Sequence, residues 1–241
     1  MAAELELLTV EAARNRVAVL RYEPIRRPRG VALVAGHGYS SSKHNLDPLC
    51  GFLASHGFTV YNLDFPGHKL GASGGALRGV DDCIDAMSST VRLARERGAT
   101  TYTLGHSMGG MTALFTAALD ESIAGAIAIA TGYGRPDSLR ALKSAGATDF
   151  RSAYVAGVTL PELVEGIDRR YDALLPRLQG RECAYVAADR DAMVSPASVR
   201  ALFDRAPERK WFATIASDHT YAAEHARAAV LQWLDERHPR P

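Results

Sequence analysis

The chain has 241 residues, enough for one large domain or two small ones, and 47% of them are hydrophobic and 23% charged, as in ordinary globular proteins. Its formal net charge of +1 gives no electrostatic basis for a nucleic acid or an anionic membrane as partner. The longest apolar run, residues 123–131, is too short to span a bilayer, and residues 1–10 lack the basic flank of a secretory signal. The three cysteines are scattered and odd in number, so we expect buried thiols in a reducing, cytoplasmic compartment, without disulfides or a metal site.

The predicted elements begin with two strands, Leu5–Val10 and Val17–Tyr22, which form an antiparallel hairpin. After this hairpin, strands and helices alternate. The further predicted strands are Val31–Ala35, Phe58–Leu63, Thr100–Leu104, Ile123–Ala130, Cys183–Ala188 and Trp211–Ile215. The predicted helices are Leu46–His56, an amphipathic helix from Val80 that ends at Gly98, a helix after Ser107, Ser195–Phe203, and a final helix with Ala222, Ala226, Val230, Trp233 and Leu234 on one side.

Alternating strands and helices predict an α/β fold, with a parallel sheet covered on both faces and ligands at the carboxyl ends of the strands. Residues 134–180 interrupt this alternation and contain helical pieces, including Leu160–Arg170. We interpret them as a cap, or lid, over the sheet edge; a longer crossover without contact to a ligand is the alternative. The chain 1–241 is then a single domain that carries the cap 134–180 as an insertion.

A serine stands between two glycines in the run Gly105-His106-Ser107-Met108-Gly109, at the end of one predicted strand. In a Gly-x-Ser-x-Gly turn between a strand and a helix, the serine hydroxyl is lifted clear of the sheet and its backbone is strained. The residues two before and two after it pack so closely that a Cβ would collide. The motif therefore predicts Ser107 as a nucleophile; an ordinary glycine-rich turn is the alternative.

A nucleophilic serine needs a base, and the base needs an acid that fixes its tautomer. His219 directly follows the last predicted strand, at the same sheet edge as Ser107, and is the predicted base; a helix-capping histidine is the alternative. Asp189 and Asp191 both follow the preceding strand. We favour Asp191 as the acid because it lies further into the loop, before the apolar pair Met193-Val194 that would anchor it. Asp189 is then expected to be a solvated loop carboxylate.

The oxyanion of an acyl-transfer reaction needs two backbone donors. One is expected at Met108, where the helix dipole also helps. The other is expected in the loop Gly36-His37-Gly38-Tyr39, whose glycines let the backbone approach a substrate; a simple turn is the alternative.

These motifs resemble the α/β-hydrolase superfamily, in particular its monoacylglycerol lipases, carboxylesterases and serine aminopeptidase-like hydrolases. The similarity runs over nearly the whole chain and includes the run Asp64-Phe65-Pro66-Gly67-His68. It implies a mostly parallel sheet with an N-terminal hairpin and a short cap. It also implies the following roles: nucleophile Ser107, acid Asp191, base His219, and backbone oxyanion donors Tyr39 and Met108. One departure is the segment 69–73, which makes the loop after His68 longer than is usual in the family.

We therefore expect a cofactor-free serine hydrolase that cleaves small carboxylic esters through an acyl-enzyme. The segment 134–180 is short and has no strongly amphipathic helix for docking to a membrane, which favours short to medium acyl chains. The side chains of Tyr39 and Tyr133 are the predicted pocket wall, and no charged pocket for an amine or a carboxylate is identifiable. A thioesterase, a lactonase or a monoacylglycerol lipase with the same triad remains an alternative, as do an acyltransferase and a non-catalytic scaffold. The sequence gives no prediction of oligomeric state.

Overall fold

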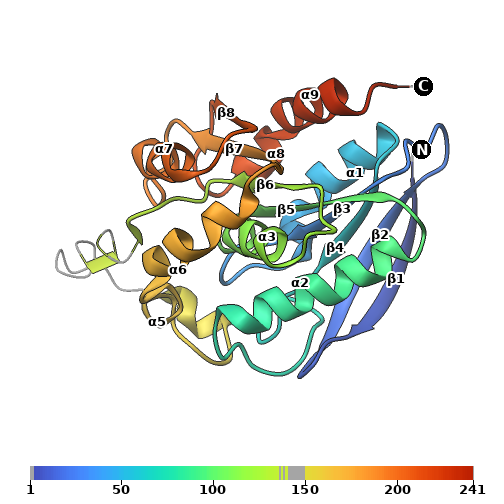
Figure 1. Ribbon diagram of the computed structural model, residues 1–241. Coiled ribbons are helices and arrows are strands. Elements are labelled where there is room, and N and C mark those ends of the chain that lie inside the picture. The colour runs from blue at the N-terminus through green and yellow to red at the C-terminus, as the bar shows by residue number, and fades with distance from the viewer. Residues whose placement is uncertain (1–2, 136, 138, 141–149, 241) are drawn as a thin grey trace.

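The computed structural model describes residues 3–135, 137, 139–140 and 150–240. An eight-stranded sheet runs through the molecule in the order β1-β2-β4-β3-β5-β6-β7-β8 (Figure 1). The strands are β1 (Ala3–Glu11), β2 (Arg16–Pro24), β3 (Val31–Gly36), β4 (Thr59–Leu63), β5 (Thr100–His106), β6 (Gly125–Ile129), β7 (Glu182–Ala188) and β8 (Lys210–Ile215).

The sheet is mostly parallel. Strand β1 pairs antiparallel with β2, and β2 pairs antiparallel with β4. All further pairings, from β4 across to β8, are parallel. The predicted N-terminal hairpin and parallel sheet are thus confirmed, and the carboxyl ends of β3, β5, β6, β7 and β8 meet at one edge.

Helices cover both faces of the sheet. Those of the main body are α1 (Asp47–Ser55), α2 (Val80–Arg95), α3 (Met108–Leu119), α7 (Pro196–Arg205), α8 (Ala222–His225) and α9 (Arg227–Arg237). One core cluster joins the sheet to α2, α3 and α7, and a second joins its other face to α1, α8 and α9. Strand β3 is buried along its whole length and sends alternate side chains to the two clusters, which explains why it is apolar at every position.

The predicted final helix was wrong in one respect, because the structure divides it into α8 and α9. Ala226, with a ψ of −8°, ends the first helix and precedes the second. The five apolar residues predicted to share one side nevertheless all belong to the same core cluster.

The segment 134–180, which the sequence predicts to be a cap and for which we keep that name, lies between β6 and β7. Of the predicted segment 134–180, residues 136, 138 and 141–149 are outside the described residues. The described part contains η2 (Phe150–Tyr154), α5 (Leu160–Val164), α6 (Ile167–Leu174) and η3 (Leu175–Leu178), and Figure 1 shows α5 and α6 on the α3 side of the sheet. The predicted helix Leu160–Arg170 is broken by Gly166, whose φ of +68° is left-handed.

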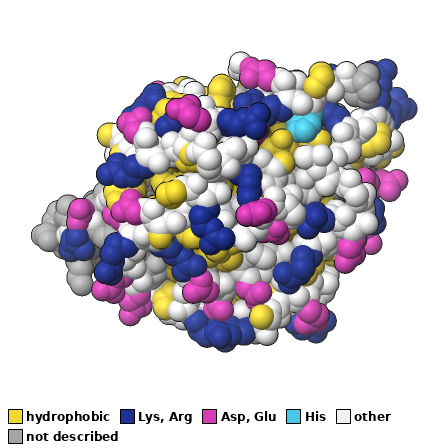
Figure 2. Space-filling model, viewed as in Figure 1, with side chains coloured by type: hydrophobic (Ala, Val, Ile, Leu, Met, Phe, Trp, Pro, Cys, Tyr) yellow, Lys and Arg dark blue, Asp and Glu magenta, His cyan; other side chains and the backbone are white. Residues whose placement is uncertain are grey.

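Charged side chains of both signs are interspersed over the face seen in Figure 2, in keeping with the small net charge. None of the helices in the described part of the chain has the length and apolar character needed to cross a membrane. The three cysteines, Cys50, Cys83 and Cys183, are buried free thiols, as predicted.

Candidate active site

The turn from β5 to α3 holds Ser107 in a strained conformation, with φ +55° and ψ −117°. A Cβ added to Gly105 would lie 2.1 Å from the carbonyl carbon of Gly109, and one added to Gly109 would lie 1.9 Å from the carbonyl oxygen of Gly36. The predicted need for glycine on both sides of the serine is confirmed. The turn is also tied to β6, because the Ser107 amide donates to the Ile129 carbonyl at 2.8 Å.

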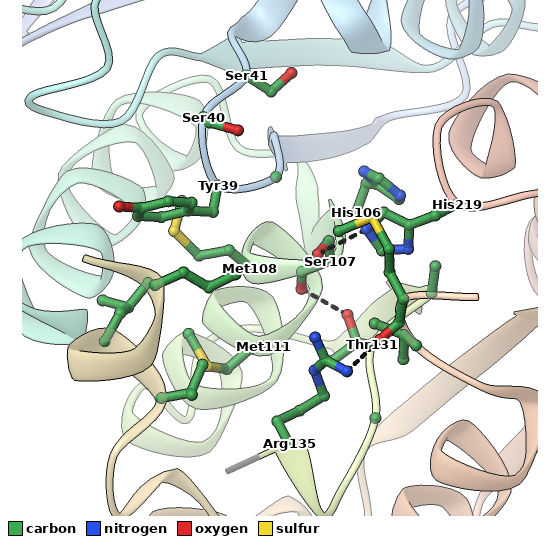
Figure 3. A pocket seen from close by; sticks show the side chains of 18 of the residues that line it. Tyr39, Ser40, Ser41, His106, Ser107, Met108, Met111, Thr131, Arg135 and His219 are labelled. Carbon is green, nitrogen blue, oxygen red and sulfur yellow. Dashed lines mark hydrogen bonds between the residues drawn. The ribbon is translucent and has the colours of Figure 1, made fainter. Parts of the chain in front are cut away.

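Three predicted residues from three loops come together at the carboxyl edge of the sheet. Nε2 of His219 lies 3.2 Å from Oγ of Ser107, and Nδ1 of His219 lies 2.7 Å from Oδ2 of Asp191. Ser107 follows β5, Asp191 follows β7 and His219 follows β8. Figure 3 shows the His219 ring directed at the Ser107 hydroxyl. This is the arrangement in which an imidazole can remove a proton from a serine.

Asp191 is buried, and both of its oxygens are engaged. Oδ2 faces His219, while Oδ1 accepts from the amides of Met193 at 2.8 Å and Val194 at 2.7 Å. Burial alone would raise the pKa of Asp191, but the hydrogen bond and charge of His219, together with the two amides, hold that pKa below its usual value. The carboxylate therefore stays ionised and keeps Nδ1 of His219 as the donor.

Asp189 is more than the solvated carboxylate that the sequence led us to expect. Its Oδ1 accepts from the amide of Ser217 at 3.0 Å, although its side chain is 47% exposed. The amide of Arg190 donates to the Ser217 carbonyl at 3.0 Å. The loop after β7 thus holds the loop after β8, two residues before His219.

His106 is a buried packing residue beside the site. Its ring lies 4.7 Å from the His219 ring, centroid to centroid. Burial and, to a smaller extent, the nearby His219 lower the pKa of His106 to about 3. His106 is therefore neutral near pH 7 and places no positive charge against the His219 ring.

The loop after β3 approaches the serine from the other side. A Cβ on Gly38 would lie 3.3 Å from Nδ1 of His106 and 3.4 Å from Cβ of Ser107, so this backbone lies close to the turn. Tyr39 follows directly and lines the same pocket as Ser107 and Met108. The Met108 amide is the first of α3 and has no acceptor within its helix. Both predicted oxyanion donors thus belong to backbone that borders Ser107.

His37 joins this loop to the loop after β4. Its Nε2 accepts from the Phe65 amide at 3.0 Å, and its Nδ1 then donates to the Gly38 carbonyl at 2.8 Å. Burial lowers the pKa of His37 to about 3, which keeps the ring neutral as this pairing requires. A neutral imidazole thereby fixes the backbone directly before Tyr39.

Asp64 organises the longer loop that departs from the family's usual pattern. Its carboxylate accepts from Lys43 Nζ at 2.6 Å, the Lys43 amide at 2.7 Å and the Ala72 amide at 2.8 Å. Burial would raise the pKa of Asp64, but the bonds from Lys43 and Ala72 lower it overall. Gly71 lies against the same carboxylate, where a Cβ would meet Oδ1 at 2.8 Å. Segment 69–73 therefore wraps around a buried anion.

A pocket of about 230 Å³ opens beside Ser107 and His219. Its walls come from the loop after β3, from α3 and from the cap; the apolar lining is Met108, Met111, Leu160, Leu163, Val164, Ile167, Met193 and Val194. Tyr39 lines it as predicted, and its hydroxyl donates to the Val158 carbonyl at 3.0 Å and contacts Ser152 Oγ at 3.2 Å. The described part of the cap thus forms one wall and is tied to the loop after β3.

The prediction that Tyr133 forms a pocket wall was wrong. Its hydroxyl bonds to the Asp172 carboxylate at 2.9 and 3.0 Å, and the Arg205 guanidinium stacks 3.9 Å from its ring. These contacts with α6 and α7 hold the side chain away from the pocket, whose lining does not include it. Two arginines, Arg135 and Arg151, line the pocket instead; the sequence carried no signal for them, because both lie in the cap outside any motif.

No group of three or more His, Cys, Asp or Glu side chains is arranged to hold a metal ion among the residues that the structure describes.

Comparisons with known proteins agree with this fold. Residues 26–165, more than half of the chain, match the family described as serine aminopeptidase, S33. No curated protein matches the chain significantly. Solved structures that share its fold include the following three. An esterase of Pyrococcus furiosus is 18% identical, with a TM-score of 0.72 over 97% of this chain and 93% of that one. A cold-adapted esterase from an Arctic intertidal metagenomic library is 19% identical, with a TM-score of 0.71 over 98% and 95%. The esterase domain of a Rhodothermus marinus protein is 20% identical, with a TM-score of 0.70 over 97% and 98%.

The resemblance and the α/β-hydrolase fold expected from the sequence are confirmed, and the chain belongs to the serine aminopeptidase S33 family of α/β hydrolases.

Proposed function

We propose that this protein is a serine hydrolase that cleaves carboxylic esters through an acyl-enzyme on Ser107. One observation carries the proposal: the two consecutive contacts from Ser107 Oγ to His219 and from His219 to Asp191, at the mouth of a pocket. A buried, ionised carboxylate behind a histidine serves catalysis by fixing the tautomer that accepts a serine proton.

In the proposed reaction, His219 Nε2 takes the proton of Ser107 as Oγ attacks the ester carbonyl. Asp191 accepts from Nδ1 and stabilises the imidazolium that forms. The amides of Met108 and Tyr39 donate to the developing oxyanion, where one such donor contributes about 10²- to 10³-fold in rate. His219 then passes its proton to the leaving alcohol. In the second half-reaction His219 takes a proton from water as the water oxygen attacks the acyl carbonyl, and it returns that proton to Ser107 Oγ as the acid leaves.

Esters are favoured over peptides with a free N-terminus by the charge of the pocket. Within the described residues, no Asp or Glu lines it, and its lining includes Arg135 and Arg151. A substrate ammonium would meet positive charge, and none of the described lining residues would offer it a carboxylate. The structural relatives reported above are described as esterases, which agrees with this choice.

The pocket also favours short to medium acyl chains. Its volume of about 230 Å³ is below the roughly 300–1,000 Å³ of ordinary small-molecule sites. We further propose a cytoplasmic location, because Cys50, Cys83 and Cys183 are free thiols.

Labelling with a fluorophosphonate probe tests the nucleophile directly. We expect the wild-type protein to be labelled and the Ser107→Ala variant to remain unlabelled. A parallel panel of p-nitrophenyl esters, acyl thioesters and aminoacyl anilides tests the substrate class, with esters turned over fastest. Labelling of the variant would contradict the assignment of Ser107, and faster turnover of anilides would contradict the ester class.

A further inference from the structure

Arg135 and Arg151 bring two positive charges into a pocket whose described lining holds no carboxylate. Arg135 comes from the segment after β6, and Figure 3 shows its guanidinium extending into the pocket toward Ser107. Arg151 comes from η2 in the cap, and its guanidinium contacts Met193 Sδ at 3.5 Å. Met193 also accepts a hydrogen bond from Arg135 through its carbonyl, so both guanidinium groups reach the same residue of the pocket wall.

Arg135 is half-buried and has unused hydrogen-bonding capacity. A guanidinium has five N–H donors, and the bond to the Met193 carbonyl uses one of them. Among the residues that the structure describes, no carboxylate lies within ion-pair distance of Arg135. Burial lowers the pKa of Arg135, yet arginine remains protonated at every physiological pH. The charge of Arg135 therefore persists, and no described residue supplies a counter-charge at contact distance.

The two acids that act on Arg135 from further away are engaged elsewhere. Asp191 is held by His219 and two amides, and Oδ1 of Asp168 accepts from the Gly134 amide at 3.0 Å. Tyr171 lines the pocket, interacts electrostatically with Arg135 and is 1% exposed. Burial raises the pKa of Tyr171, so its hydroxyl keeps its proton and can donate.

We propose that Arg135, assisted by Arg151, binds a carboxylate carried by the ester substrate, so that the protein prefers anionic esters to neutral ones of the same size. This inference rests on the proposed ester hydrolysis. Desolvating a cation without a counter-charge is costly, and a carboxylate supplies both the missing charge and a planar partner for the guanidinium fork. The carboxylate can belong to the acyl group or to the leaving alcohol.

Two pairs of substrates distinguish these sources. The acyl arm compares the p-nitrophenyl monoester of glutaric acid with p-nitrophenyl pentanoate. The alcohol arm compares 4-acetoxybenzoate with its neutral methyl ester. Ser107→Ala supplies the background rate for each compound. We expect kcat/KM to favour the anionic member by about 10- to 100-fold in one arm, the range of a charge-assisted hydrogen bond in a pocket.

The variants separate anion binding from a merely structural contact. In Arg135→Gln, the ratio of kcat/KM for the anionic ester to that for the neutral ester is expected to fall to within about threefold of one. Arg135→Lys should keep most of the preference. If Arg135 only supported Met193, Arg135→Gln would lower kcat/KM for anionic and neutral esters alike. Arg177→Gln is the matched control, because Arg177 is an exposed arginine of the cap outside the pocket lining and should leave the preference unchanged.

The wild-type comparison can overturn the inference even if Arg135→Gln fails to fold. Hydrolysis of the neutral esters without preference for an anion in either arm rejects the anion site and leaves the proposed function standing. A preference that survives both Arg135→Gln and Arg151→Gln also rejects it. Hydrolysis of none of the four esters rejects the proposed function, and the anion site with it.

Discussion

Gly109 faces Gly36 so closely that a Cβ on Gly109 would lie 1.9 Å from the carbonyl oxygen of Gly36. This contact joins the first turn of α3 to the last residue of β3. The strained turn at Ser107 and the loop that leads to Tyr39 are therefore held in one fixed relation. The positions of the proposed nucleophile and of both proposed oxyanion donors depend on this backbone contact, together with the His37 imidazole that holds the backbone before Tyr39.

Gly109→Ala is expected to lower the free energy of unfolding by about 3 kcal/mol or more, because two backbone segments must separate to admit the methyl group. Gly51→Ala is the control. Gly51 lies inside α1, and a Cβ there would meet nothing within 4 Å. It should stabilise the protein by about 0.5–1 kcal/mol. Urea unfolding measures the free energy of unfolding of both variants. Equal values for the two would contradict the close contact between Gly109 and Gly36.

Ser107→Ala is expected to lower kcat for a p-nitrophenyl ester by at least about 10⁴-fold, as the loss of a triad nucleophile does. Its melting temperature should stay close to that of the wild type, since the alanine occupies the space of the serine. Steady-state kinetics and a thermal melt measure the two quantities. Residual activity above about a tenth of the wild type would mean that another residue is the nucleophile.

The two acids of the loop after β7 should differ in what they affect. Asp191→Asn is expected to lower kcat by roughly 10³ to 10⁴, because an amide favours the wrong tautomer of His219 and cannot stabilise imidazolium. Asp189→Asn should lower kcat by less than about tenfold, because Asp189 contacts Ser217 and not the imidazole. Parallel measurements of kcat for the two variants test this assignment. A larger loss of kcat in Asp189→Asn than in Asp191→Asn would make Asp189 the acid.

Buried histidines predict a loss of stability in mildly acidic solution. The pKa of His106 is about 3 in the folded protein, against about 6.5 for an unperturbed histidine. Between these values the unfolded chain binds the proton and the folded chain does not, so stability falls as the pH decreases from about 6.5 toward 3. His37 acts in the same direction. Asp191 and Asp64, whose pKa values are lowered, add a further loss as their carboxylates become protonated at still lower pH.

His106→Phe removes one of these groups and keeps a ring in its place. Urea midpoints of the variant and the wild type, measured from pH 7 to pH 4, should show a shallower decline for the variant. Equal slopes would mean that His106 is not the neutral buried ring that its surroundings require.

The sequence predicted the parts of the site that depend on local backbone. The glycines around Ser107 follow from a steric demand within five residues, and the structure meets it at Gly105 and Gly109. Asp191 and His219 were placed because the carboxyl ends of parallel strands share one edge, so the order of elements along the chain located their loops.

The features that the sequence did not predict depend on the direction in which loop side chains point and on the packing of the cap. Asp189 turns toward Ser217, and Tyr133 turns toward Asp172 on α6; no periodicity encodes either direction. The division of the predicted helix at Gly166 requires a left-handed φ that a glycine permits but does not demand. Arg135 lines the pocket from the segment after β6, where no motif marks it.

The dependence of kcat/KM on acyl-chain length tests whether the cap forms only a shallow wall of the pocket. Each buried methylene can contribute up to ~0.8 kcal/mol, so kcat/KM should rise over the first methylenes that the pocket accepts. The pocket has a volume of about 230 Å³ and is closed by Leu160, Leu163 and Ile167. Once the acyl chain fills it, further methylenes should no longer raise kcat/KM. We expect an optimum at or below roughly eight carbons among p-nitrophenyl acetate, butyrate, octanoate and palmitate. Leu163→Ala, which trims this wall, should move the optimum toward longer chains. A maximum at palmitate in the wild type would mean that the cap encloses a lipid tunnel instead.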